Sequence, residues 1–180
     1  MKMLKHPNIL RIHDIYEDLN NIYLILDYCS GGELYQRLNN VQKRGMVFSE
    51  TRVRLLMRQI LSALAYMHAN NILHKDLKPE NIMFVDSSIR DHLVIIDFGL
   101  SEIFEKSQTI SHHAGGTVLY MAPEVFSRKL SFKSDVWSAG CIMFLLLTGY
   151  LPFSGRTITE VNEAVNNSNP KYQTRCTHCK

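Results

Sequence analysis

Long apolar runs, cysteines and an excess of charge of one sign are all scarce in this sequence of 180 residues. The longest apolar stretch, residues 136–147, includes Ser138 and Gly140 and is too short to cross a bilayer. Residues 1–7 contain no apolar signal core, so the sequence gives no support for secretion. A net charge of +3 gives no reason to expect binding to nucleic acid or to an anionic membrane. We therefore expect a cytoplasmic location, with no nucleic-acid partner and no membrane partner.

The four cysteines are too few for a disulfide-rich secreted domain. Cys29 and Cys141 lie in apolar segments and are interpreted as small core residues. Cys176 and Cys179 have the spacing of half a zinc site, but the sequence offers no obvious second pair of ligands. So few cysteines, without a secretory signal, fit a reducing cytosol.

What is present is the composition of one soluble globular domain, with 46% hydrophobic and 21% charged residues. The basic residues are dispersed. Those at 43–44 and the three arginines Arg52, Arg54 and Arg58 are expected on solvated helix faces. The sequence contains no internal repeat and no EF-hand loop for calcium.

The first part of the chain predicts a β-hairpin followed by a helix. Residues 9–16 and 21–28 have the composition of two strands, and the turn at residues 17–20 makes them an antiparallel pair. Residues 30–32, Ser-Gly-Gly, end the second strand, and a short helix is predicted from Glu33.

A long helix is predicted to begin after Ser49 and to end at residues 70–71. Its apolar face follows the helical period and comprises Val53, Leu56, Met57, Ile60, Leu61, Leu64 and Met67. Short strands are predicted at residues 82–84 and 93–96, and a helix that is apolar on nearly all sides at residues 135–148. Residues 166–180 are polar and are predicted to form a loop or a frayed tail.

The most informative pattern is His-Lys-Asp-Leu-Lys-Pro-Glu-Asn at residues 74–81, followed by Asp-Phe-Gly at residues 97–99. Asp76 can orient a hydroxyl, and Lys78 is a point charge suited to a transferring phosphate. Asn81 and Asp97 offer the hard oxygen ligands that Mg²⁺ prefers. Singly, Asp76, Lys78 and Asn81 could be a turn cap, a surface residue and a loop contact. Together, in this order and spacing, they indicate phosphoryl transfer.

With these motifs, and with residues 116–124 and 135–140, the chain resembles a eukaryotic protein kinase from about His6 to about Tyr172. The resemblance implies an α+β, protein-kinase-like fold with a mostly helical C-lobe and a two-strand remnant of the N-lobe sheet. It implies N-lobe strands and hinge at residues 1–28, a C-lobe at 29–165 and a polar tail at 166–180. No Gly-rich phosphate loop and no lysine-bearing strand precedes the motifs, so we expect a domain cut off at both ends.

The resemblance also implies the roles of individual residues. Asp76, Lys78 and Thr117 would be catalytic, Asn81 and Asp97 would bind Mg²⁺, and ATP would be the phosphoryl donor. The positions implied for nucleotide binding are Leu26, Asp27, Cys29, Glu33, Lys78, Glu80, Asn81, Met83 and Asp97. Within this set, Leu26 would be the gatekeeper, Glu33 would reach the ribose and Met83 would lie under the base. Core packing is the alternative for Cys29 and Met83.

Protein substrates that carry Ser or Thr are implied, because residues 78–81 have the serine/threonine form of the catalytic loop. Glu33 and Glu80 match positions at which basophilic kinases hold an arginine, so an Arg three residues before the acceptor is hypothesised. Alternatively, both glutamates contact ribose or solvent. Asp135 would anchor the backbone of the catalytic loop, and Glu124 is expected to be exposed or unpaired because its usual arginine partner is not found.

Two departures set the chain apart from most kinases. Lys75 replaces the arginine that grips a phosphate on the activation segment, and His113 stands where that phosphate would be carried. Activation by phosphorylation of this segment is therefore not expected, although Ser107, Thr109 and Ser111 remain possible acceptors. The pattern resembles the calcium-dependent protein kinases of the calmodulin-dependent kinase group, in which a calcium sensor region would belong only to a longer parent.

The leading interpretation is a truncated serine/threonine protein kinase, and weak or no phosphoryl transfer is expected from the chain alone. One alternative is a catalytically weak fragment or pseudokinase-like module that binds proteins. The other is a small-molecule phosphotransferase of related fold, which the Ala-Pro-Glu sequence at residues 122–124 disfavours.

Overall fold

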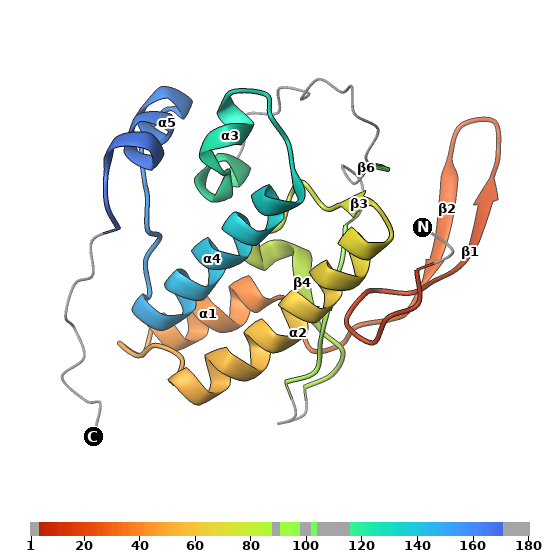
Figure 1. The fold of residues 1–180 in the computed structure, drawn as a ribbon. Coiled ribbons are helices and arrows are strands. Elements are labelled where there is room, and N and C mark those ends of the chain that lie inside the picture. Colours follow the sequence, from red (N-terminus) through yellow and green to blue (C-terminus); the bar gives the residue numbers. More distant parts are fainter. Residues whose placement is uncertain (1–3, 88–90, 98–101, 104–115, 171–180) are drawn as a thin grey trace.

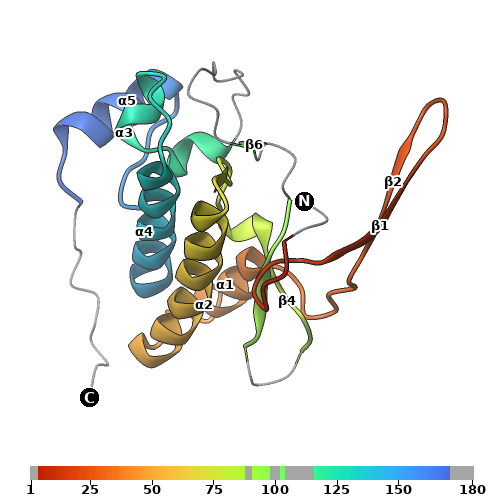
Figure 2. The same ribbon diagram turned by 45° about the vertical axis from the view of Figure 1, so that its right-hand side comes forward.

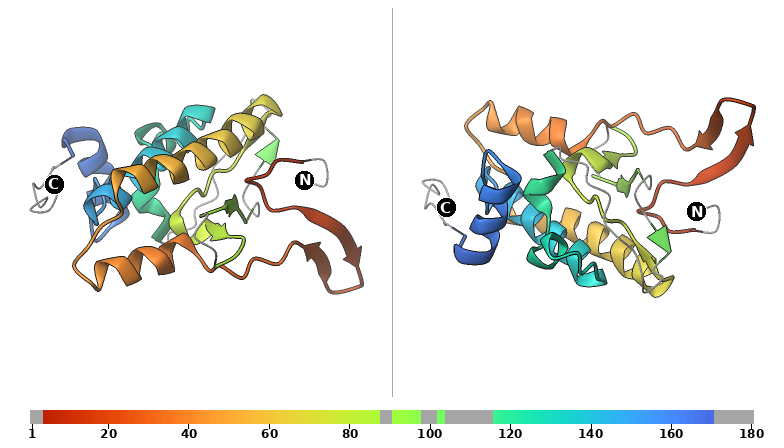
Figure 3. Two further views of the ribbon diagram at one scale, coloured as in Figure 1. Left: turned by 90° about the horizontal axis from the view of Figure 1, so that it is seen from below. Right: turned by 90° about the horizontal axis from the view of Figure 1, so that it is seen from above.

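The computed structural model describes residues 4–87, 91–97, 102–103 and 116–170, with only the backbone described at residues 102, 103, 116 and 117. Within these ranges the fold is α+β, as predicted, with a helical body from which one β-hairpin extends (Figure 1). The hairpin and α5 (Ile158–Asn167) lie at opposite ends of the molecule (Figure 3).

The hairpin pairs β1 (Ile12–Glu17) with β2 (Ile22–Leu26) in antiparallel register. It points away from the helices (Figure 2). Large apolar side chains on both strands are exposed. Both strands are shorter than predicted. The physical reason at the start is that Ile9 and Leu10 contact another strand instead: Leu10 N donates to Ile95 O at 3.0 Å.

The helical body is built on α2 (Glu50–Ala69), which begins as predicted after Ser49, whose side chain accepts a hydrogen bond from Arg52 N. The predicted apolar face is buried except at Leu61, which is 45% exposed, while Ala63 is fully buried. The buried stripe therefore includes Ala63 and leaves out Leu61. Helix α2 packs against α4 (Phe132–Thr148). These two helices lie side by side (Figures 1 and 2).

Helix α4 begins at Phe132, three residues before its predicted start at Asp135. The reason is a capping box, in which Ser131 N donates to Ser134 Oγ and Lys133 N donates to Ser131 Oγ, both at 3.2 Å. The helix supplies much of the core, as predicted, although Val136 and Met143 are exposed. Among the described residues, no helix combines the length and the apolar character needed to cross a membrane.

Helix α5 was not predicted. Thr157 caps it by accepting a hydrogen bond from Glu160 N at 3.2 Å, and Val161 and Val165 bury one face. This small apolar cluster also contains Val118 and Phe153. The predicted loop at 166–180 is therefore wrong for residues 166 and 167, which are helical. Residues 171–180, with both cysteines of the considered half zinc site, lie outside the described residues.

The smaller elements surround the catalytic motifs. They are α1 (Leu34–Gln42), β3 (Ile72–Leu73), the 3₁₀ helix η1 (Pro79–Asn81), β4 (Ile82–Phe84), β5 (Leu93–Ile95), β6 (Glu102–Ile103), η2 (Gly116–Tyr120) and α3 (Pro123–Phe126). Strands β4 and β5 pair antiparallel, with Ile82 opposite Ile95. This pairing brings the end of the residue 74–81 loop beside the segment that leads to Asp97.

Candidate active site

Asp135 of α4 anchors the start of the loop at residues 74–81. Asp135 is 2% exposed, and its two oxygens accept hydrogen bonds from His74 N and Lys75 N, each at 3.0 Å. His68, near the end of α2, places Nε2 2.8 Å from the same carboxylate. The anchoring contact predicted for Asp135 is therefore present. It fixes the start of the loop, where Lys75 has a left-handed backbone with φ +68°.

Asp76 is the centre of the loop and is 7% exposed. Its Oδ2 accepts hydrogen bonds from Lys78 Nζ at 2.6 Å and from Asn81 Nδ2 at 3.2 Å. Asn81 Nδ2 also donates to the backbone oxygen of Asp76 at 2.8 Å. The other oxygen, Oδ1, is buried and has no hydrogen-bond partner within the described part of the chain. Oδ2 of Asp76 is thus occupied by two hydrogen bonds, and Oδ1 retains its capacity to accept a proton or a hydrogen bond.

His74 connects this loop to the segment before Asp97. It is fully buried; Nδ1 accepts a hydrogen bond from Asp76 N at 3.3 Å, and Nε2 donates to Ile96 O at 3.2 Å. Both contacts require the neutral imidazole with its proton on Nε2. Burial lowers the pKa of His74, and the nearby carboxylates of Asp135 and others oppose this effect only in part. A neutral His74 therefore helps to set the backbone of Asp76.

Asp97 follows directly on this connection. Ile96 N donates to Asn81 O at 2.9 Å, so the residue before Asp97 is bonded to the backbone of Asn81. Asp97 is exposed and has a left-handed backbone with φ +59°. The loop at residues 74–81 and the segment that ends at Asp97, far apart in the sequence, thus lie together in the fold.

The residues present fit a magnesium site in which phosphate and water complete the ligands. No group of three or more His, Cys, Asp or Glu that could hold a metal occurs among the described residues. Mg²⁺ needs no such cage, since one or two protein oxygens and substrate phosphates are its usual ligands. Asn81 uses its amide nitrogen on Asp76, which makes its amide oxygen the available ligand, and Asp97 adds an exposed carboxylate.

The segment predicted to contact the nucleotide runs beside β4. Ser30 N donates to Val85 O and Gly31 N to Phe84 O, both at 3.0 Å, so the chain after the hairpin lies along this strand. Glu33 and Met83 form a β-bridge, and both are half-buried. The structure therefore brings these two predicted contact residues together, at the strand that follows Asn81.

The remaining hinge residues lie between this segment and the hairpin. Leu26 ends β2 and is 40% exposed. Asp27 is exposed, and its carboxylate lies 2.6 Å from Nε2 of His13. Cys29 is half-buried, which corrects its interpretation as a core residue, whereas Cys141 is buried as expected. Burial, aided by the charge of Asp27, raises the pKa of the Cys29 thiol.

Other predicted positions have different outcomes. Glu80 lies in η1, and its Oε2 is buried without a hydrogen-bond partner among the described residues. Thr117 lies in η2, but its side chain is outside the described part, as are residues 107–113 of the predicted activation segment. Glu124 is half-buried rather than exposed, and Ser134 Oγ donates to its Oε1 at 2.9 Å. A hydroxyl group does not neutralise the carboxylate, so the expectation of an unpaired charge stays a prediction.

The prediction of a solvated Arg52 is wrong, and its two charged neighbours, Asp91 and Arg37, were not predicted. Arg54 and Arg58 are exposed as expected, but Arg52 is half-buried and binds Asp91 through Nε at 2.6 Å. Asp91 in turn pairs with Arg37. No local sequence pattern predicts this cluster of Arg37, Arg52 and Asp91, since its members come from three separate segments.

Comparison with known proteins agrees with this geometry. The family model described as "Protein kinase domain" matches residues 1–178. The chain belongs to the protein kinase domain family. The chain is 54% identical over 170 residues to calcium-dependent protein kinase 6 of Plasmodium berghei (strain Anka), covering 94% of the chain and 11% of that protein.

Other relatives show a similar degree of likeness. Calcium-dependent protein kinase 5 of the same organism is 43% identical over 169 residues, covering 92% of the chain and 28% of that protein. Calcium-dependent protein kinase 3 of Plasmodium yoelii yoelii is 41% identical over 161 residues, covering 89% and 29% respectively. The chain thus spans less than a third of the length of these relatives.

Proposed function

We propose that the protein is a serine/threonine protein kinase that transfers the γ-phosphoryl group of ATP to a hydroxyl of a protein substrate. Membership of the kinase family supports the class of enzyme. The observation that carries the mechanism is the environment of Asp76, one of whose oxygens binds Lys78 and Asn81 while the other is buried without a partner among the described residues.

In this mechanism Asp76 orients the attacking hydroxyl through Oδ1 and accepts its proton as the new bond to the γ-phosphorus forms. The bond from that phosphorus to the bridging oxygen of the β-phosphate breaks, and ADP leaves. Lys78 holds the opposite oxygen in place and offsets negative charge on the transferring group. Asn81 fixes the same carboxylate through its amide nitrogen. Asn81 and Asp97 would hold Mg²⁺, which when bound neutralises charge on the phosphates.

The preference for Ser and Thr is part of this proposal and is supported by the sequence of residues 78–81, Lys-Pro-Glu-Asn. A preference for an arginine three residues before the acceptor is supported by Glu80, a half-buried carboxylate at a position that matches the arginine contact of basophilic kinases. A guanidinium group is a favourable partner for such a carboxylate. Glu33, on the bridge with Met83, is the second candidate contact.

Calcium control and a cytoplasmic location are also proposals. The names of the relatives describe calcium-dependent kinases, and we extend this property to a protein in which these residues are joined to a calcium-binding region. The proposed cytoplasmic location is supported by the small number of cysteines, which fits a reducing compartment.

The test is phosphoryl transfer by the full-length protein from radiolabelled ATP to a matched pair of serine peptides, one with Arg and one with Gln at the third position before the serine. Transfer to the Arg peptide, with a higher kcat/KM than for the Gln peptide, is expected. Equal rates would remove the arginine preference alone. Tight binding of MgADP with no transfer to any peptide or protein would contradict the kinase proposal and favour a protein-binding module.

A further inference from the structure

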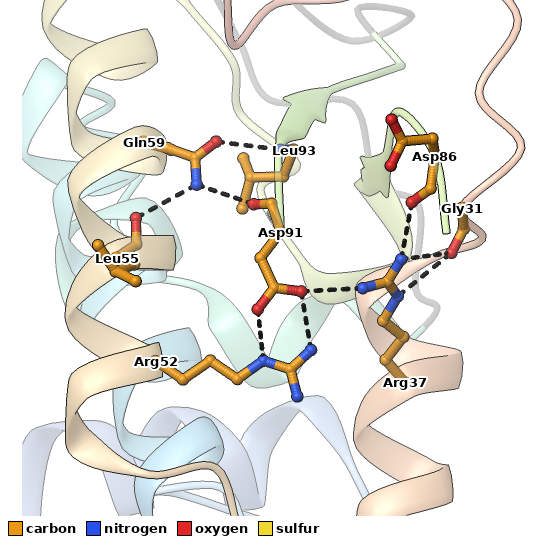
Figure 4. Close-up of polar contacts among 8 residues, drawn as sticks. All are labelled: Gly31, Arg37, Arg52, Leu55, Gln59, Asp86, Asp91 and Leu93. Carbon is orange, nitrogen blue, oxygen red and sulfur yellow. Dashed lines mark hydrogen bonds and ion pairs between the residues drawn. The ribbon is translucent and has the colours of Figure 1, made fainter. Parts of the chain in front are cut away.

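Two arginines from different helices share the carboxylate of Asp91, which lies just before β5 (Figure 4). Arg52 of α2 binds it with two hydrogen bonds, Nε to Oδ2 at 2.6 Å and Nη2 to Oδ1 at 2.8 Å. Arg37 of α1 donates Nη1 to Oδ1 at 2.9 Å. Asp91 is only 9% exposed, and charge-assisted pairs of this kind hold a fixed geometry. The Arg37–Asp91–Arg52 cluster therefore joins α1 and α2 across the start of β5.

The remaining donors of Arg37 bind the backbone (Figure 4). Nε and Nη2 donate to Gly31 O at 3.2 and 3.1 Å, and Nη2 also donates to Asp86 O at 2.9 Å. The guanidinium carbon lies 3.5 Å from the centre of the Phe84 ring. Only the planar guanidinium group, with its several N–H donors, can bind a carboxylate and two carbonyl oxygens at once while it stacks on an aromatic ring. Lysine cannot reproduce this set of contacts.

Gly31 belongs to the linker, residues 29–33, which connects the hinge to α1 and contains two of the proposed nucleotide contacts, Cys29 and Glu33. One edge of the linker is fixed by β4, where Phe84 N donates to Gly32 O at 2.9 Å. The linker is closely packed at Gly31, because a Cβ at this position would lie 2.1 Å from Asp86 O. Arg37 therefore holds a carbonyl in the middle of a closely packed segment.

Asp91 is itself held independently of the linker. Gln59 of α2 donates to its backbone oxygen at 2.9 Å and accepts a hydrogen bond from Leu93 N at 3.0 Å (Figure 4). Burial lowers the pKa of Arg37, and the charge of Asp91 opposes this effect while Arg52 adds to it. Asp91 thus compensates two neighbouring positive charges, and it ties the linker to the long helix of the body.

We propose that Arg37, held by Asp91, is a positioning residue that fixes the linker for nucleotide binding. The inference rests on the proposed function, since it takes Cys29 and Glu33 as contacts of ATP. Without Arg37 the linker populates more conformations, and only a fraction of them binds ATP well. The transfer step at Asp76 is unaffected once ATP is bound. The expected signature is a raised KM for ATP, with kcat at saturating ATP and the KM for peptide unchanged.

The experiment compares Arg37→Gln with the wild-type full-length protein by two readouts, the Kd for MgADP from calorimetry and steady-state kinetics. We expect the Kd for MgADP and the KM for ATP to rise roughly tenfold, as for the loss of a few charge-assisted contacts. The variant Arg37→Lys keeps the positive charge but lacks the planar guanidinium group, so it should recover little of the affinity for MgADP. Arg54→Gln, at an exposed position of α2, is the matched control and should leave both constants unchanged.

A double-mutant cycle separates positioning from general destabilisation. Asp91→Asn should raise the Kd for MgADP by itself, and adding it to Arg37→Gln should have little further effect, because both act through one contact. A lowered melting temperature with an unchanged Kd for MgADP in Arg37→Gln would overturn the proposal. So would a fall in kcat with an unchanged KM for ATP.

The two proposals can fail separately. If wild type binds MgADP but transfers no phosphate, the proposed function fails, and the Kd comparison still decides the role of Arg37. If wild type is active and Arg37→Gln matches it in Kd and KM, only the positioning role fails. Should Arg37→Gln not fold, Asp91→Asn is measured in its place, and an unchanged Kd for MgADP in that folded variant overturns the proposal.

Discussion

Lys78 and Asp76 form a close ion pair, with Nζ of the lysine 2.6 Å from Oδ2 of the aspartate. Two residues apart in one loop, they are held together by a backbone that Asp135 anchors at its start and η1 fixes at its end. The pair leaves the second oxygen of Asp76 in a buried position without a partner among the described residues. This arrangement suits a carboxylate that receives a hydroxyl proton on one side while a cation neutralises charge on the other.

Replacing Lys78 should therefore impair transfer more than nucleotide binding. For Lys78→Met we expect kcat to fall about a hundredfold or more, as for the removal of one electrostatic contact to the transition state. The Kd for MgADP should change little. Lys43→Met, at an exposed position after α1, is the matched control. A Lys78→Met protein with kcat close to that of wild type would show that the ion pair has no role in transfer.

Removal of the Asp135 carboxylate should destabilise the protein. Asp135→Ala leaves two backbone N–H groups of the loop without their acceptor and deprives His68 of its partner. We expect a loss of about 3 to 5 kcal/mol in the free energy of unfolding, measured by urea denaturation. Val136→Ala, at the exposed neighbouring position, should change it by less than about 0.5 kcal/mol. Equal stability of the two variants would contradict the anchoring role.

Two glycines should respond oppositely to alanine. A Cβ at Gly31 would lie 2.1 Å from Asp86 O and 2.6 Å from Phe84 Cβ, whereas a Cβ at Gly140 of α4 would meet no atom within 4 Å. Gly31→Ala should lower the free energy of unfolding by about 1 to 3 kcal/mol through overpacking. Gly140→Ala should raise it by about 0.5 to 1 kcal/mol, because alanine has the higher helix propensity. Thermal denaturation of both variants checks the difference in sign.

Stability should fall when the pH is lowered from neutral. Burial lowers the pKa of His74 below its ordinary value of 6.5. The unfolded chain therefore binds the proton more readily than the folded chain, and folding stability is lost as the pH drops below about 6.5 toward the lower folded pKa. The His74→Gln variant cannot titrate there, so its urea midpoint should decline less steeply between pH 7.5 and pH 5. The same slope in both proteins would contradict a neutral buried His74.

The sequence predicted best what local spacing determines. Ser49 and the 3.6-residue period located α2, and the motif at residues 74–81 located the loop. It predicted less well where two distant surfaces meet. Leu61 fits the period but is exposed, and α5 depends on a small apolar cluster with Val118 and Phe153. These outcomes are decided by packing, which one segment does not contain.

The candidate site shows the same division. Contacts within or next to the motifs, such as Asn81 with Asp76, follow from their short spacing. The contact of Asp135 with the loop, 61 residues away from His74, was expected only because of the family resemblance. The role of Arg52 could not be read from α2, because an arginine at the edge of a helix looks solvated until its partner Asp91 is known.

The most direct test of the mechanism is the Asp76→Asn variant of the full-length protein, assayed for both phosphoryl transfer and MgADP binding. Asparagine keeps the shape of the side chain but cannot accept the proton of the substrate hydroxyl. The account predicts that kcat falls by about two to four orders of magnitude while the Kd for MgADP stays close to that of wild type. A kcat within a few-fold of wild type would contradict the role assigned to Asp76.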